Sequence, residues 1–148
     1  MSQKVIDSAL ARFTDDHNCA QSVLISFLEH KGLSITEAVH LAAGFGGGIG
    51  LQGKTCGAAT GGVLAIGALT GQTISNLGDS KNETYGLVMR FLKRFRSEFS
   101  SQMCSDLVRL DMTDPKQLQA ALDEGHFKKT CPKFVEGAMR ILLDIFPQ

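Results

Sequence analysis

LAAGFGGGIGLQGKTCGAATGGVLAIGAL, residues 41–69, changes character halfway along its length. The first half is a glycine cluster, which favours a shaped backbone excursion between helices over a continuous helix. The second half, residues 56–69, is rich in glycine and alanine, and small side chains let neighbouring backbones approach closely. We therefore expect a glycine-rich loop that leads into a central small-residue helix.

Outside this stretch, apolar residues recur at helical spacing nearly throughout, and no alternating strand pattern competes. We expect an all-α fold: a single-domain compact helical bundle over residues 1–148, with roughly seven or eight helices. The expected helices cover residues 2–13, 18–30, 35–43, 56–69, 81–99, 103–110, 114–123 and 132–146. Six residues of the long helix are expected in the core: Tyr85, Val88, Met89, Leu92, Phe95 and Phe99.

The composition excludes several classes of function. The 15 basic and 15 acidic side chains give a formal net charge of zero, which supports no broad electrostatic attraction to nucleic acid. The segment 2–13 forms an amphipathic helix and does not resemble a secretory signal. The apolar part of 56–69 is shorter than the roughly 20 residues that span a bilayer. We expect a cytoplasmic protein with no nucleic-acid partner and no membrane insertion.

Each of the four cysteines lies close to an expected helix start. Asn18 can cap a helix with Cys19 in its first turn, and Thr55 stands in the same relation to Cys56. Thr130 precedes Cys131, with Pro132 suited to the first turn. Either Ser100 or Ser101 could cap the remaining helix, which would leave Cys104 one turn inside it.

A helix start favours the thiolate over the thiol. Its backbone N–H groups and the positive end of its dipole stabilise an anion by about 0.3–1 kcal/mol, and by about 2 in a partly buried setting. That could lower a thiol pKa from about 8.5 towards 7. Lys128, Lys129 and Lys133 flank Cys131 and could add to the effect.

The sequence also contains a nucleotide-binding pattern without its structural context. Residues 48–55, GIGLQGKT, match the phosphate-binding P-loop, and Asp144 follows an apolar run that resembles a magnesium-binding strand. The P-loop depends on a buried strand that precedes it. Here the preceding segment reads as a helix, and no βα units are available. No nucleotide cofactor is expected.

The order of the cysteines, together with CGAATG at residues 56–61, resembles the C_GCAxxG_C_C family of redox-active proteins. Members are small chains with one early cysteine, a glycine-rich segment leading into a CGAxxG motif, and two later cysteines. The matching positions are Cys19, then Cys56, Gly57, Ala58 and Gly61, then Cys104 and Cys131. The resemblance implies redox activity and, in some members, a genomic setting near transporters, so that a transporter is one implied partner.

Three functions remain open from the sequence. In the first, the protein is a thiol–disulfide oxidoreductase with an unknown redox partner, in which Cys56 is the preferred nucleophile and Cys19, Cys104 or Cys131 resolves the bond. In the second, the same four cysteines bind zinc or an iron–sulfur cluster, although closely spaced ligand pairs are absent. In the third, they are buried packing residues of a non-catalytic binding protein. His17 could be a ligand or proton carrier, but a capping or exposed role is commoner for such a histidine.

Overall fold

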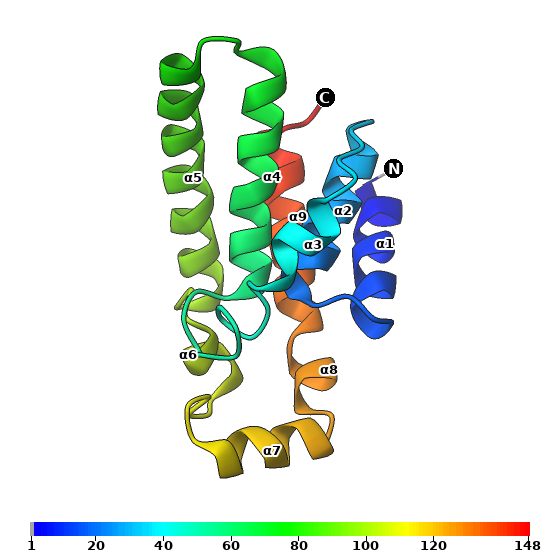
Figure 1. Cartoon of the computed structure of the whole chain (residues 1–148), viewed down its shortest axis with the longest axis vertical. Coiled ribbons are helices and arrows are strands. Elements are labelled where there is room, and N and C mark those ends of the chain that lie inside the picture. The colour runs from blue at the N-terminus through cyan, green and yellow to red at the C-terminus, as the bar shows by residue number, and fades with distance from the viewer. Residues whose placement is uncertain (1) are drawn as a thin grey trace.

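The small-residue helix α4, Gly57–Thr73, lies at the centre of the molecule and packs against α2, α5 and α9 (Figure 1). Its composition explains this position. A Cβ atom on Gly61 would lie 2.7 Å from the carbonyl oxygen of Ala20 on α2, and one on Gly62 would collide with the ring of Phe91 on α5. Only glycine allows both neighbours to come so close.

The computed structural model describes residues 2–148, and within that range it contains nine helices and no strand, which confirms the all-α fold. The helices are α1 (Ser2–Thr14), α2 (Cys19–His30), α3 (Ala38–Ala43), α4 (Gly57–Thr73), α5 (Leu77–Phe99), α6 (Cys104–Val108), α7 (Pro115–Asp123), α8 (His126–Thr130) and α9 (Pro132–Ile145). No helix within residues 2–148 combines the length and hydropathy that crossing a membrane requires.

Aromatic side chains connect α5 to α9 across the core. Phe91 and Phe95 are fully buried, and the ring of Phe95 lies 4.9 Å from that of Phe99, centroid to centroid. Phe99 in turn meets Phe134 of α9 edge to face at 5.0 Å. Such pairs add to the free energy of apolar burial. They hold α9, which follows Cys131, beside α5.

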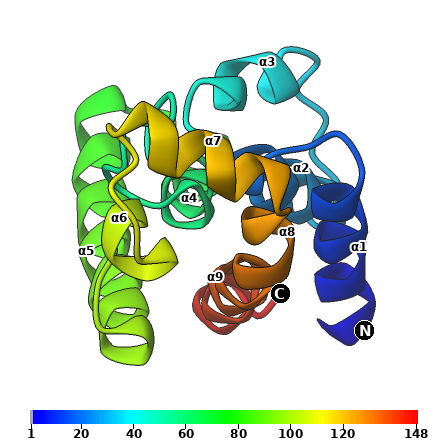
Figure 2. The ribbon, with the colours of Figure 1, turned by 90° about the horizontal axis from the view of Figure 1, so that it is seen from below.

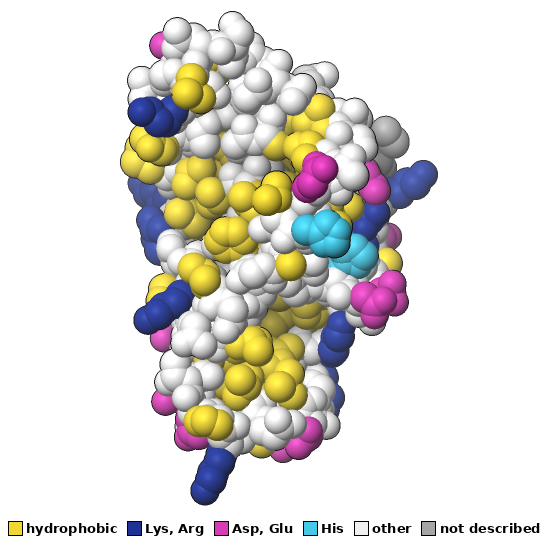
Figure 3. All heavy atoms as spheres, viewed as in Figure 1, with side chains coloured by type: hydrophobic (Ala, Val, Ile, Leu, Met, Phe, Trp, Pro, Cys, Tyr) yellow, Lys and Arg dark blue, Asp and Glu magenta, His cyan; other side chains and the backbone are white. Residues whose placement is uncertain are grey.

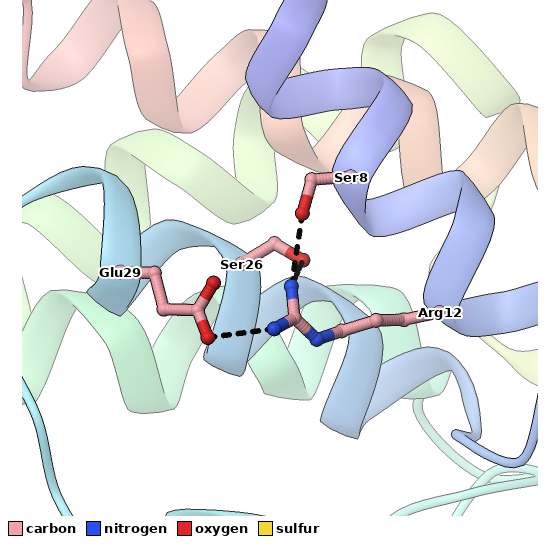
Figure 4. Close-up of polar contacts among 4 residues, drawn as sticks. All are labelled: Ser8, Arg12, Ser26 and Glu29. Carbon is pink, nitrogen blue, oxygen red and sulfur yellow. Dashed lines mark hydrogen bonds and ion pairs between the residues drawn. The ribbon is translucent and has the colours of Figure 1, made fainter.

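Arg12 joins the first two helices through polar contacts (Figure 4). Its guanidinium donates to the hydroxyls of Ser8 on its own helix and Ser26 on α2, at 2.9 and 3.0 Å. It also pairs with Glu29 at 2.6 Å. Because Ser26 is buried, this contact satisfies a hydroxyl that burial would otherwise leave unpaired. It fixes the position of α2, which begins with Cys19.

A loop with left-handed backbone conformation leads into α4. Five consecutive residues, Gly47 to Leu51, have φ between 59° and 71°. Glycine adopts such values freely, whereas Ile49 and Leu51 are strained there. A Cβ atom on Gly48 would lie 2.6 Å from that of Cys104, so glycine is also needed for this close approach. The helix α3 precedes the loop, and so the P-loop pattern has no strand before it.

The helices α6, α7 and α8 form the end of the molecule opposite the C-terminus, and α7 crosses beneath the bundle (Figures 1 and 2). Asp114 caps α7 by accepting a hydrogen bond from the backbone N–H of Lys116, with Pro115 in the first turn. The short α8 was not expected, because its sequence HFKKT carries little apolar periodicity.

Two expectations for the long helix were wrong. It begins at Leu77, capped by the side chain of Asn76, and not near residue 81. Tyr85 and Met89 are exposed, at 59% and 66% of their surface, and not in the core. Since α5 lies at the edge of the bundle, against α4 and α9, one side of it stays uncovered. Hydrophobic side chains are visible in patches on the face that carries α4 and α5 (Figure 3).

Candidate thiol site

Each of the four cysteines stands at the start of a helix. Cys19 and Cys104 are the first residues of α2 and α6, while Cys56 and Cys131 are the N-cap residues of α4 and α9. The general prediction from the sequence is therefore confirmed. Cys104 begins its helix directly, because the cap is Met103 and neither Ser100 nor Ser101.

Of the predicted helix caps, Asn18 is confirmed, whereas Thr55 and Thr130 are wrong. Asn18 caps α2 as expected, accepting a hydrogen bond from the backbone N–H of Gln21 at 2.9 Å, and Gln21 reciprocates. Pro132 occupies the first turn of α9 as expected. Thr55 and Thr130 do not cap their helices: the cysteine after each takes that position, without a side-chain hydrogen bond to the helix.

A short antiparallel bridge between Thr55 and Met103 brings Cys56 and Cys104 together. The backbone N–H of Cys56 donates to the carbonyl of Gln102 at 2.7 Å, and that of Cys104 donates to the carbonyl of Lys54 at 2.6 Å. In antiparallel pairing, diagonal neighbours of this kind lie on the same side of the ribbon. Cys56 and Cys104 thus form one pair of the site.

Cys19 and Cys131 form the second pair, because both line the same cavity and each thiol shifts the pKa of the other. Gly57, the first residue of α4, lies against this pair. A Cβ atom at Gly57 would lie 3.1 Å from that of Cys19 and equally close to the carbonyl oxygen of Phe45. The glycine of the CGAxxG motif therefore allows the starts of α2 and α4 to meet.

All four cysteines line one cavity of about 250 Å³. The wall is mostly apolar and comes from segments far apart in the sequence. Its larger apolar residues are Phe13, Leu51, Leu107, Val108, Phe127 and Phe134. Sequence reasoning did not identify these residues, because their apolar character marks them only as core. Their common location depends on tertiary packing.

Only Cys131 has a lowered pKa among the four. The hydrogen bond from Cys19 lowers the pKa of the Cys131 thiol most strongly, and the positive charge of Lys133 lowers it further, against the effect of burial. The same hydrogen bond, together with burial and the neighbouring cysteines, raises the pKa of Cys19 well above its usual value. The interaction between the two thiols thus favours the thiolate on Cys131 and the protonated thiol on Cys19.

Burial raises the pKa of Cys56 to about 11 and that of Cys104 to about 12. The expectation that the helix start would lower the pKa of Cys56 was therefore wrong. The backbone N–H groups of Ala58 and Ala59 do lower it, but desolvation of the nearly inaccessible sulfur acts more strongly.

Two polar side chains on the cavity wall differ in what they contact. Lys128 donates to the backbone carbonyls of Phe13 and Asp15 and lies over the ring of Phe13, 4.9 Å from its centroid. By contrast, the Nδ1 atom of His17 is buried without a hydrogen-bond partner. His17 is thus neither an exposed residue nor a helix cap in the structure.

No group of three or more His, Cys, Asp or Glu side chains in residues 2–148 has an arrangement that could hold a metal ion. The four-cysteine metal site inferred as an alternative from the sequence remains a prediction.

A family model described as "Putative redox-active protein (C_GCAxxG_C_C)" matches residues 17–145, a range that contains all four cysteines. The match confirms the resemblance seen in the order of the cysteines and the CGAxxG motif. Searches of curated proteins and of solved structures gave no match.

Proposed function

Because the chain belongs to the C_GCAxxG_C_C family of redox-active proteins, we propose that Cys19 and Cys131 are its working dithiol, exchanging between reduced and disulfide forms. Cys131 is the attacking thiolate, and Cys19 is the resolving thiol. This assignment replaces Cys56 as the preferred nucleophile, since burial keeps Cys56 protonated at neutral pH.

The observation that supports the proposal is that the two thiols line one cavity and interact there. Their interaction shifts the two pKa values in opposite directions, which favours a nucleophilic thiolate on Cys131 and a protonated thiol on Cys19. Two thiols that line one cavity and interact directly also need little backbone movement to reach bonding distance. The pair therefore has both properties that thiol–disulfide exchange requires.

The exchange proceeds in two steps. The thiolate of Cys131 attacks one sulfur of a substrate disulfide, the substrate S–S bond breaks, and the released thiolate takes a proton. The thiol of Cys19 then loses its proton and attacks the sulfur of Cys131 in the mixed disulfide. The second substrate thiolate leaves, two electrons have passed to the substrate, and Cys19 and Cys131 are joined.

Cys56 and Cys104 complete the site as neutral thiols in this proposal. Their raised pKa values keep negative charge away from the Cys131 thiolate at neutral pH. A cytoplasmic location is part of the proposal, because a reducing compartment returns an oxidised pair to the dithiol form.

The test is to oxidise the reduced protein with diamide under native conditions and to map the disulfides by peptide mass spectrometry without reduction. We expect one intramolecular bond, between Cys19 and Cys131. Cys131→Ser and Cys19→Ser should abolish it, whereas Cys56→Ser should retain it. A bond between Cys56 and Cys104, or thiols that react only after unfolding, would contradict the proposal. The second result would favour buried packing residues.

A further inference from the structure

We infer that the cavity at the four cysteines is the binding site for a small, uncharged, apolar disulfide, which is the oxidant of the Cys19–Cys131 pair. The inference rests on the proposed function, because Cys131 supplies the attacking thiolate. It adds the chemical class of the substrate.

The size of the cavity limits what can enter. Its volume of about 250 Å³ exceeds the roughly 150 Å³ of an engineered cavity that holds benzene, and falls below the roughly 300–1,000 Å³ typical of sites for drug-sized ligands. A disulfide with two short alkyl arms is of this scale. The peptide arms of a tripeptide disulfide are not.

The wall of the cavity selects against charge. Its larger side chains are the apolar residues named above, and burying an unpaired charge against them is costly. The cation on the wall, Lys128, already donates to two backbone carbonyls. Asp16 also lines the cavity, and both it and Lys128 are exposed, so that their charges remain in contact with water. A charged arm of a substrate that passed these two residues would lie against the apolar wall.

In residues 2–148, one buried polar side-chain atom has no hydrogen-bond partner. The unpartnered Nδ1 of His17 is buried on a residue of this wall, two positions before Cys19. A single polar point in an apolar wall is typical of sites for mostly apolar ligands, where it fixes their orientation.

The reaction balances without another reagent. One disulfide R–S–S–R and the thiols of Cys19 and Cys131 give two thiols R–SH and the Cys19–Cys131 disulfide. The substrate is reduced by two electrons, and both protons come from the protein thiols or from water.

The experiment compares three disulfides of nearly equal size: dipropyl disulfide, its dicationic isostere cystamine, and the dianionic dithiodiglycolate. Each second-order rate of Cys19–Cys131 bond formation is divided by the rate of the same compound with dithiothreitol, because leaving-group acidity alone changes exchange rates. We expect the normalised rate of dipropyl disulfide to exceed the other two by about tenfold or more. Equal normalised rates would overturn the inference.

Two matched variants test whether the cavity itself makes the selection. Leu51 lines the cavity and is 40% exposed, whereas Ile49 of the same loop does not line it and is 45% exposed. Their φ angles are 65° and 64°, so a substitution strains both backbones alike. Leu51→Glu should raise the rate of cystamine relative to dipropyl disulfide about fivefold. Ile49→Glu should keep the wild-type ratio, and an equal change in both variants would contradict the inference.

Diamide oxidation distinguishes a failure of the proposed function from a failure of the inferred substrate class. If diamide produces no Cys19–Cys131 bond, the proposed function itself is wrong. If diamide produces that bond while the three normalised rates are equal, only the substrate class is wrong.

Discussion

Cys19 and Cys131 carry the same side chain, and yet their pKa values are shifted in opposite directions. Both stand at helix starts, where the backbone favours an anion. The difference arises from their contact: the sulfur that accepts the shared hydrogen bond is stabilised as a thiolate, and the sulfur that donates cannot lose its proton without losing that bond. Lys133 then favours the thiolate on Cys131 through its charge.

This asymmetry predicts how alkylation of Cys131 depends on pH. The rate of its reaction with iodoacetamide, followed by mass spectrometry of the peptide, should reach half its maximum below the pH found for a free cysteine. In Cys19→Ala the donor is lost, so the half-maximal pH should rise. In Cys19→Ser a hydroxyl can still donate, so the value should stay close to that of the wild type. Equal rises in both variants would show that the hydrogen bond does not set the pKa.

The positions of the cysteines could be predicted from local sequence, whereas their ionisation could not. Asn18 and Pro132 signal helix starts through neighbours only a few residues away. The pKa of Cys56 depends instead mainly on burial, and its surroundings include Gln102, to whose carbonyl its backbone N–H donates from far along the chain. The free energy of desolvation exceeds that of the helix start, and no local pattern reports it.

At the scale of elements, the glycines of α4 have unequal roles. Gly61 faces α2, where a Cβ atom would lie 2.7 Å from the carbonyl oxygen of Ala20. Gly67 faces open space, with nothing within 4 Å of such an atom. The first glycine is required by packing, and the second only lowers the helix propensity of its segment.

Alanine substitutions should therefore have opposite effects at these two positions. Gly61→Ala should lower the free energy of unfolding by about 1–3 kcal/mol, because a backbone carbonyl must move. Gly67→Ala should raise it by about 1 kcal/mol, because alanine loses less entropy in a helix. Urea unfolding followed by circular dichroism measures both. A stabilised Gly61→Ala variant would mean that α2 and α4 are less closely packed than described.

The helices themselves could be predicted from apolar periodicity with two informative failures. Tyr85 and Met89 have the spacing of core residues, but periodicity shows only that a helix has an apolar side. Whether that side is covered depends on how many neighbours the helix has. The helix α8 was missed for the opposite reason, since its five residues are held by the elements on either side and lack a pattern of their own.

At the scale of the whole molecule, the starts of α2, α4, α6 and α9 meet at one cavity. The cavity exists only when segments from both ends of the chain are in place. All four of its thiols therefore contribute to the pH dependence of the entire fold, since their pKa values change on unfolding.

The free energy of unfolding of the reduced protein should fall as the pH rises above about 8.5, the pKa of a free thiol. In the folded protein Cys56 and Cys104 stay protonated up to about pH 11 and 12. Their contribution to the free energy of unfolding is therefore complete below about pH 8.5 and is lost as the pH rises from there to about 11 and 12. Each can add a slope of up to about 1.36 kcal/mol per pH unit. Cys19 acts in the same sense, because its pKa is raised, and Cys131 acts in the opposite sense, because its pKa is lowered.

Urea unfolding between pH 7 and 11 under reducing conditions tests this expectation. Cys56→Ala should show a shallower decline than the wild type, since one buried thiol is removed. Met89→Ala, at an exposed position, should run parallel to the wild type. Parallel curves for all three proteins would mean that Cys56 ionises equally in the folded and unfolded chain.

The pairing of Cys19 with Cys131 joins positions about 110 residues apart, so a bond between them would enclose most of the chain. In the chain-entropy model, closing a loop of about 100 residues stabilises a fold by about 4.7 kcal/mol. That is comparable with the lower end of the whole stability of a typical domain, about 5 kcal/mol. Proteases act mainly on transiently opened molecules. Oxidation would therefore lengthen the lifetime of the protein in the cell, and reduction would return it to ordinary turnover.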